Sequence, residues 1–167
     1  EHLLDVPHSY LVVHHAQPLT AEQEQQYKQL LERAQQQEPI PYITGQAPFF
    51  DFELHVTPAV LIPRPETEQL VETAVAYARQ HNAQTAVDVG TGSGCMAIAL
   101  ARFLPDLQVT AVDISPAALA IAQQNARQLA PGRIQFQQSD LLQTIARPVN
   151  MIVANLPYVT SGEWQSL

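Results

Sequence analysis

The alternation of short apolar runs with helical segments after residue 85 is the feature that most limits the fold. Each run is short enough for a buried strand, and each intervening segment repeats its apolar residues at helical spacing. Such alternation predicts parallel strands joined by right-handed crossovers, and hence an α/β fold with a doubly wound, mostly parallel sheet. The predicted strands are 85–89, 107–112, 133–137 and 149–154, and the predicted helices are 93–103 and 116–129.

The first 84 residues follow a different pattern. A capping box predicts a helix over 20–37, and a Pro/Gly-rich linker follows at 39–48. Alternating apolar and polar residues over 50–56 predict a strand with one exposed face, and Pro65 is suited to begin a further helix. We therefore expect three parts, namely a partial helical N-terminal domain at 1–40, a linker and β-hairpin at 41–63, and the α/β domain at 64–167.

A glycine-rich loop, "VDVGTGSG" (87–94), joins the first strand of the predicted sheet to its helix. Its three glycines allow a tight turn and a close approach of the backbone to a ligand. Asp113 ends the next strand, where a carboxylate can accept hydrogen bonds from both hydroxyls of a ribose. A dinucleotide-binding loop would have its third glycine at the position of Cys95, so the pattern favours a nucleoside over a pyrophosphate.

Acidic residues around this loop sharpen the prediction. Asp88 adds negative charge just before the first glycine of the loop, where a cationic ligand is favoured. Asp140 follows the third strand and is placed to bind an adenine amino group, with Leu141 packing on the ring. A helix cap by Ser139 or Asp140 is an equally good interpretation of that segment. These features suit S-adenosyl-L-methionine, which combines an adenosine with a sulfonium and an amino group.

The last predicted strand ends in "NLPY" (155–158), on the same edge of the sheet as the glycine loop. An amide or aromatic amine nitrogen is a poor nucleophile because its lone pair is delocalised. The Asn155 side-chain oxygen and the Leu156 carbonyl can accept its two protons and favour the cation that develops on methylation. Pro157 fixes the turn, and Tyr158 can stack on the flat acceptor group. The alternative is an asparagine that simply begins a loop before proline.

Several segments together resemble the HemK/PrmC family of class I methyltransferases. They are "PYITG" (41–45), "LIPRPETEQLVE" (61–72), "VDVGTGSG" (87–94), "VDISPAALAIAQQNA" (112–126) and "NLPY" (155–158). Members of this family have a Rossmann-like fold and methylate the glutamine in the Gly-Gly-Gln motif of peptide-chain release factors. The resemblance thus implies an S-adenosylmethionine-dependent enzyme with release factors as its protein substrates.

The resemblance also implies the site residues. The expected cofactor-binding residues are Gly90, Thr91, Gly92, Ser93, Gly94, Asp113, Asp140, Leu141 and Asn155. The expected catalytic and glutamine-binding residues are Asn155, Leu156, Pro157 and Tyr158. Arg64 and Glu66 receive no specific role, and a structural ion pair is an equally good interpretation of them.

The chain departs from the family pattern in two respects. Leu156 stands where the family usually has a proline, and Asn-Leu-Pro-Tyr also resembles the motif of ribosomal RNA adenine dimethyltransferases. The alternative function is therefore adenine amino methylation of ribosomal RNA or DNA. Family members also extend beyond both ends of this chain, so we expect C-terminal strands to be missing. A cofactor-binding fragment without turnover is a third possibility.

Composition bears on the partners. Residues 1–85 hold four basic and eleven acidic residues, and the net charge of −8 argues against direct nucleic-acid binding. No apolar run approaches the length that spans a bilayer, so we expect no membrane association.

The chain has a single cysteine, Cys95, which excludes an internal disulfide and fits a cytoplasmic location. Buried packing suits Cys95 better than nucleophilic catalysis. We expect a monomer, and we predict no metal site, since His14 and His15 are best explained as a surface pair.

Overall fold

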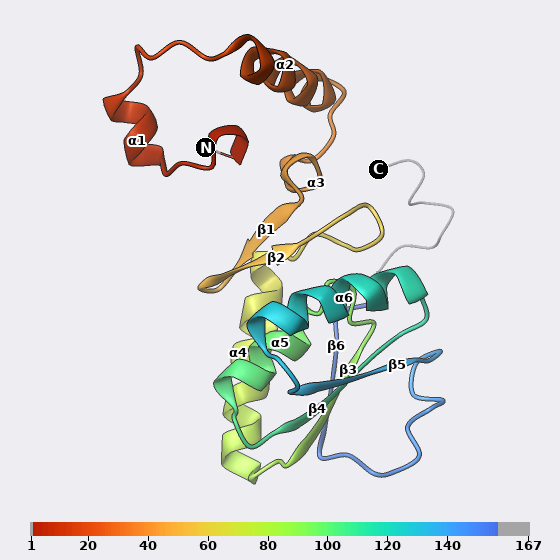
Figure 1. The fold of residues 1–167 in the computed structure, drawn as a ribbon. Helices are drawn as coiled ribbons and strands as arrows, with labels where there is room; N and C mark the ends of the chain where they lie inside the picture. Colours follow the sequence, from red (N-terminus) through yellow and green to blue (C-terminus); the bar gives the residue numbers. More distant parts are fainter. Residues whose placement is uncertain (1, 157–167) are drawn as a thin grey trace. The chain divides into compact units, whose positions relative to one another are not determined.

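The computed structural model describes residues 2–156 of the 167-residue chain (Figure 1). The chain divides into two compact units, Glu1–Gly45 and Gln46–Leu167. None of the helices in the described part of the chain is both long and apolar enough to cross a membrane.

The first unit is helical. Its elements are the 3₁₀-helix η1 (His2–Leu4) and the helices α1 (His8–Val13), α2 (Ala21–Gln35) and α3 (Ile40–Thr44). Helix α2 begins with the predicted capping box, in which the Thr20 hydroxyl accepts from the Gln23 N–H and the Gln23 side chain accepts from the Thr20 N–H. Among residues 2–45, only Ile43 is buried. Local hydrogen bonds rather than a large core therefore define this unit.

The segment predicted as a linker, 39–48, is instead partly regular. Residues 40–44 form α3, because prolines are accepted in the first turn of a helix, where no N–H partner is needed. Gly45, with φ of 72°, ends this helix in the left-handed conformation. The strand that follows begins at Gln46, inside the predicted linker.

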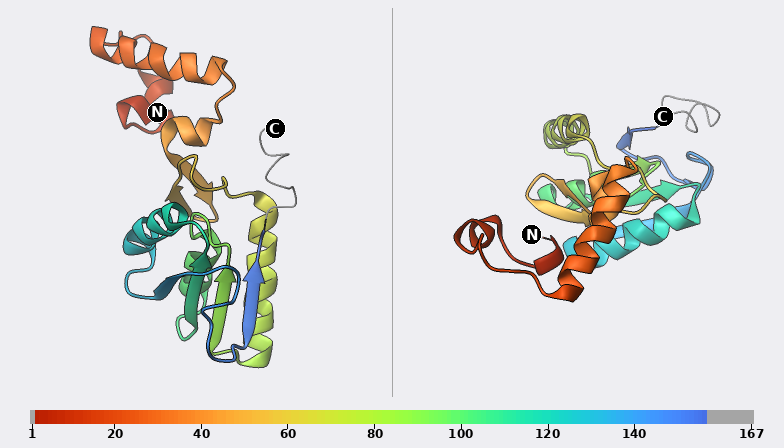
Figure 2. Two further views of the ribbon diagram at one scale, coloured as in Figure 1. Left: turned by 90° about the vertical axis from the view of Figure 1, so that its right-hand side faces the viewer. Right: turned by 90° about the horizontal axis from the view of Figure 1, so that it is seen from above.

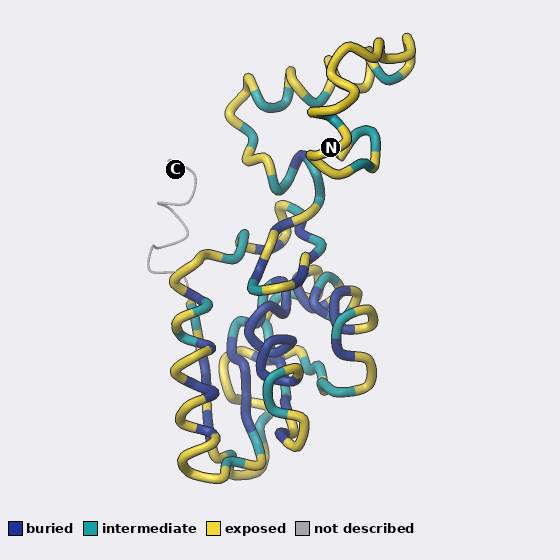
Figure 3. The backbone as a smooth tube through the Cα atoms, turned by 90° about the vertical axis from the view of Figure 1, so that its left-hand side faces the viewer, coloured by how far each residue is buried: buried dark blue, intermediate teal, exposed yellow. Residues whose placement is uncertain are grey.

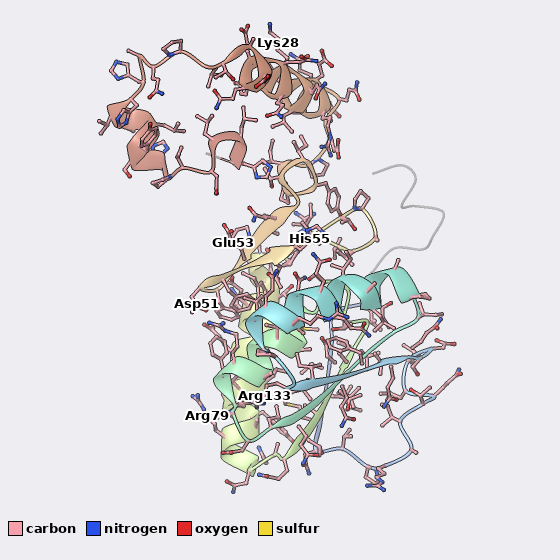
Figure 4. The ribbon with its side chains drawn as sticks, viewed as in Figure 1. Lys28, Asp51, Glu53, His55, Arg79 and Arg133 are labelled. Carbon is pink, nitrogen blue, oxygen red and sulfur yellow. The ribbon has the colours of Figure 1, made fainter. Side chains whose placement is uncertain are left out.

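The second unit opens with a β-hairpin of β1 (Gln46–Phe49) and β2 (Phe52–His55), in which Phe49 pairs with Phe52. The strand predicted over 50–56 therefore begins too early, since Phe50 lies in the turn with φ of 51°. The predicted alternation holds within β2, where Phe52 and Leu54 are buried. The polar residues that alternate with them, Asp51 in the turn and Glu53 and His55 in β2, are labelled in Figure 4.

A four-stranded parallel sheet forms the centre of the second unit. Its strands are β3 (Thr85–Val89), β4 (Gln108–Asp113), β5 (Ile134–Gln138) and β6 (Met151–Ala154), in the order β5-β4-β3-β6. The helices are α4 (Pro65–His81), α5 (Cys95–Phe103) and α6 (Pro116–Leu129). Each predicted strand and helix of this part is present, which confirms the α/β class.

The three helices lie on one face of the sheet, as the view from above in Figure 2 shows. On the opposite face Val87, Val89 and Val112 form an apolar cluster, against which Ile145 and Val149 pack. Helix α5 is the most completely buried helix, with seven of its nine residues buried, and β3 lies beside it at the centre of the sheet (Figure 3). The strand that carries the glycine loop is thus held in the core.

Candidate active site

The carboxyl ends of β3 and β6 define the candidate site. These strands are neighbours (Figure 1). Val89 pairs with Ala154, so that Gly90 and Asn155 follow at matching positions. Because β4 lies on one side of β3 and β6 on the other, this is a topological switch point, where open α/β sheets bind ligands. A small pocket opens here, lined by Leu61, Ile62, Pro63, Thr67, Gly90, Thr91, Gly92, Ser93, Cys95, Met96 and Asn155.

Four backbone N–H groups of the glycine loop are already engaged. Gly90 and Thr91 both donate to the Val112 carbonyl, at 2.9 and 3.0 Å. Gly92 donates to Asp113 Oδ2 at 2.9 Å, and Gly94 donates to the Thr91 carbonyl at 2.8 Å. A phosphate-binding loop needs such groups to be available for the anion. The loop is therefore suited to a ligand without a pyrophosphate, in line with the sequence prediction.

Glycine is needed for different structural reasons at two positions of the loop, Gly94 and Gly92. Gly94 has φ of 83°, and a Cβ there would lie 3.1 Å from Ala122 Cβ, so glycine lets α5 begin close to α6. Gly92 has φ of 54°, and a Cβ there would meet no atom nearer than 4.0 Å. The backbone at Gly92 is thus open on the side from which a ligand can approach. The predicted helix at 93–103 begins two residues later, at Cys95, because Gly94 is not helical.

Asp88 is fully buried behind the loop. Its Oδ2 accepts from the Thr91 hydroxyl at 2.7 Å and from the Ala97 N–H at 3.1 Å, whereas Oδ1 has no hydrogen-bond partner among the described residues. The pKa of Asp88 is raised to about 6, chiefly by burial and to a smaller extent by the charge of Asp113, against the lowering effect of the two hydrogen bonds. Asp88 does not line the pocket, so its carboxylate fastens the loop to α5 and acts on a ligand only through its charge.

Asp113 lies at the end of β4, half-buried, beside the loop. Its two carboxylate oxygens accept from the N–H groups of Gly92 and Ser115, each at 2.9 Å. Each oxygen retains a second lone pair, so the carboxylate can accept further hydrogen bonds while it holds the loop. The geometry is therefore compatible with the predicted contact to a ribose.

The segment after β5 is tied to the same edge. The Ser139 N–H donates to the Asp113 carbonyl at 3.0 Å, and the Ser139 hydroxyl accepts from the Thr144 N–H at 3.2 Å. Ser139 therefore caps a turn over 141–144 and not a helix, so the predicted helix cap is wrong. The side chains of Asp140 and Leu141 are exposed, and Leu141 has φ of 50°. Both remain accessible to a ligand at this edge.

Asn155 is anchored from helix α4. Its Nδ2 donates to Thr67 Oγ1 at 2.9 Å, and Thr67 is only 3% exposed. The side chain of Leu156 lies over the first glycine of the loop, since a Cβ on Gly90 would come within 2.6 Å of Leu156 Cδ2. The predicted residues Pro157 and Tyr158 lie outside the described residues. The structure therefore brings Asn155 and Leu156 together with the glycine loop and leaves the rest of the motif undescribed.

The structure gives no catalytic role to the remaining residues considered in the sequence, which are Cys95, Arg64, Glu66 and His14. Burial and the charge of Asp88 raise the pKa of Cys95 to about 12, so the thiol stays protonated, as expected for a packing role. Arg64 occupies the N-cap of α4 without a capping hydrogen bond, and Glu66 is exposed. His14 stacks on Tyr10 at the surface. Within residues 2–156, no three His, Cys, Asp or Glu side chains gather as metal ligands.

Sequence reasoning missed Asn125, a buried residue that links the hairpin to the loop. Its Oδ1 accepts from the His55 N–H at 2.8 Å, and its Nδ2 donates to the carbonyls of His55 and Ser93, both at 2.9 Å. The available signal was a polar side chain on the buried, alanine-rich face of α6, beside Ala122 and Ala126. A buried amide is retained there because it satisfies three backbone groups at once.

Sequence reasoning also left Thr67 and Glu68 without roles, although both belong to the quoted segment 61–72. Glu68 Oε1 accepts from the Phe50 N–H at 2.7 Å and so holds the hairpin turn. Thr67 holds Asn155. One turn of α4 thus fixes both the hairpin and the end of β6, and no local pattern in the sequence indicates these distant partners.

Comparisons with known proteins agree on one family. The model of the methyltransferase small domain matches residues 67–166, and the model of the PrmC N-terminal domain matches residues 1–45. The chain is 46% identical to the release factor glutamine methyltransferase of Koribacter versatilis, covering 96% of this chain and 58% of that protein. It is 41% identical to the Escherichia coli protein of the same name, covering 95% and 57%.

A solved structure supports the same fold. The ribosomal protein L11 methylase of Lactobacillus delbrueckii subsp. bulgaricus is similar with a TM-score of 0.51 and 31% identity, covering 60% of this chain and 51% of that chain. The chain spans somewhat under three fifths of the length of the two curated relatives above.

Proposed function

Since the chain belongs to the HemK/PrmC family of methyltransferases, we propose that it methylates the side-chain amide nitrogen of a glutamine in peptide-chain release factors. The target is the glutamine of the Gly-Gly-Gln motif. The relatives at 46% and 41% identity bear the name release factor glutamine methyltransferase, which supports this choice of substrate. We further propose that the protein acts as a monomer in the cytoplasm, and that residues 1–45 contribute to recognition of the release factor.

S-adenosyl-L-methionine is the cofactor that family membership implies, as the sequence predicted. The residues at the edge of the sheet fit it, because Gly92 leaves its backbone open and Asp113 retains acceptor capacity for a ribose. The negative charges of Asp88 and Asp113 favour a cationic ligand. When bound, the cofactor supplies an electrophilic methyl group on its sulfonium.

The neighbouring positions of Gly90 and Asn155 are the observation that carries the proposal. A nitrogen held by Asn155 lies beside the loop proposed to hold the methyl donor. In our assignment, the Asn155 side-chain oxygen and the Leu156 carbonyl accept the two N–H protons of the glutamine amide. These contacts orient the nitrogen lone pair and stabilise the positive charge that develops as the carbon–sulfur bond breaks and the nitrogen–carbon bond forms. The methylated nitrogen then loses one proton to water.

Transfer of labelled methyl groups tests the proposal. The protein is incubated with methyl-labelled S-adenosylmethionine and either a release factor, the same factor with the motif glutamine replaced by alanine, or ribosomal RNA. We expect label on the first substrate alone. Label on the RNA would support adenine methylation instead, and label that persists in the alanine variant would assign a different residue of the release factor. Cofactor binding in calorimetry without any transfer would leave a binding role only.

A further inference from the structure

Thr67 contributes a buried hydroxyl to the candidate site. It lies in the first turn of α4, where its N–H donates to the Arg64 carbonyl at 2.9 Å and fixes its backbone. Its side chain is buried, and its hydroxyl receives a hydrogen bond from Asn155, a residue 88 positions later in the chain. Both side chains line the same pocket as the glycine loop.

This hydrogen bond fixes the position of the Asn155 amide group. An asparagine side chain ends in a donor and an acceptor on opposite sides of one carbon, and rotation about the last bond exchanges them. Because Nδ2 is directed at Thr67 Oγ1, the oxygen Oδ1 is directed to the other side. The same contact polarises the amide and increases the negative charge on that oxygen.

We propose that Thr67 is a positioning residue that holds the Asn155 amide in place beside the glycine loop, with Nδ2 toward α4 and the oxygen toward the acceptor nitrogen. This inference rests on the proposed function, because the acceptor is taken to be an amide with two N–H donors. A reversed Asn155 amide would direct donors at donors.

The arrangement of α4 supports a dedicated role for this hydroxyl. The adjacent Glu68 uses its side chain to hold the hairpin turn, so the first turn of α4 is built around contacts to distant segments. Thr73 of the same helix offers a contrast, since it is exposed and its hydroxyl donates to the Gln69 carbonyl within the helix. Thr73 is therefore a matched control, a threonine on the same helix with a purely local hydrogen bond.

Three variants test the inference. Thr67→Val keeps the shape of the side chain and removes the hydroxyl, Thr67→Ser keeps the hydroxyl, and Thr73→Val is the control. We expect Thr67→Val to lower kcat for a release factor about tenfold, which corresponds to the loss of one hydrogen bond. The KM for the release factor and the calorimetric Kd for S-adenosylmethionine should stay within about twofold of the unmodified protein. Thr67→Ser should restore kcat, and Thr73→Val should leave it unchanged.

A measurement independent of activity accompanies the kinetics. The side-chain amide signals of Asn155 in a nitrogen–proton NMR spectrum are assigned by their loss in Asn155→Ala. Thr67→Val should shift them and accelerate their hydrogen exchange with water, and Thr67→Ser should restore both. If Thr67→Val does not fold, Thr67→Ala is measured in its place, since a smaller side chain cannot overpack the site.

The outcomes separate this inference from the proposed function. Unchanged kcat in Thr67→Val, or an equal loss in Thr67→Ser, would overturn the positioning role, as would Asn155 signals that do not respond. If the unmodified protein transfers no methyl group to a release factor while the Asn155 signals respond to Thr67→Val, the proposed function fails and the anchoring of Asn155 by Thr67 stands.

Discussion

The two halves of the candidate site are held in place in different ways. On one side, the glycine loop follows the interior strand β3 and is fastened by the Val112 carbonyl, Asp113, Asp88 and Asn125. On the other side, Asn155 follows β6, which is the edge strand of the sheet formed by the described residues, and Thr67 anchors its side chain from α4. The cofactor half is thus built into the core, whereas the acceptor half depends on contacts at its margin. Substitutions in the two halves should therefore have separable effects.

The largest effect is expected from Asn155→Ala. It removes an acceptor that acts mainly in the transition state, so methyl transfer should fall by about 10²–10³-fold. Affinity for S-adenosylmethionine in calorimetry should change far less than the rate, although Asn155 is also among the expected cofactor-binding residues. The control is Asn150→Ala at the opposite end of β6, whose side chain accepts from the N–H groups of Gln84 and Thr85. That variant should lose stability without a comparable loss of transfer; an equal loss of affinity and transfer in Asn155→Ala would contradict the separation.

Asn125→Leu should cause the largest loss of stability. It removes the side-chain amide that bonds to the N–H and carbonyl of His55 and to the buried carbonyl of Ser93, and a buried polar group that loses such a partner costs about 1–3 kcal/mol. The free energy of unfolding should therefore fall by more than about 2 kcal/mol in denaturant titrations. Gln124→Leu, an exposed neighbour on α6, is the control. Equal stability of the two variants would show that the Asn125 contacts add nothing.

Asp113→Ala sharpens the comparison from the cofactor side. It removes the proposed ribose acceptor, which also accepts from the N–H groups of Gly92 and Ser115. Affinity for S-adenosylmethionine should therefore weaken about 10- to 100-fold. At saturating cofactor, the rate of transfer should return to near that of the unmodified protein. Asp106→Ala, in an exposed turn, is the charge-matched control. A rate that stays low at saturation would place Asp113 in the acceptor half as well.

The smallest effect concerns pH. The pKa of Asp88 is raised from 3.8 in a free side chain to about 6 in the folded protein, so the folded state favours the protonated form. Its contribution to stability is fully present below pH 3.8 and is lost as the pH rises through about 6. Subtracting the unfolding free energies of Asp88→Asn from those of the unmodified protein should reveal this decline. A difference that is flat over this range would mean that Asp88 titrates normally.

The sequence predicted the parts of the site that follow from strand order. Gly90 and Asn155 come directly after strands and Asp113 ends one, and the carboxyl ends of parallel strands share one edge. The contacts that hold these residues could not be predicted in this way. Thr67 and Asn155 are 88 residues apart, and Asn125 and His55 are 70 apart. Such pairs depend on how α4 and α6 pack against the sheet and the hairpin, which local patterns do not encode.

Two errors in the predicted elements have local causes. The hairpin turn contains Phe50 in a left-handed conformation, without the glycine or asparagine that usually indicates such a turn. Its apolar side chain therefore extended the apparent strand. The helix α3 was missed because Pro39 and Pro41 indicate a loop, although proline is well suited to the beginning of a helix.

Locating the methyl group on the release factor tests the central claim most directly. The factor is digested after incubation with the protein and S-adenosylmethionine, and its peptides are analysed by mass spectrometry. We predict the added mass of one methyl group on the glutamine of the Gly-Gly-Gln motif, and its absence when Asn155→Ala replaces the unmodified protein. A methyl group on any other residue, or equal modification by Asn155→Ala, would contradict the account.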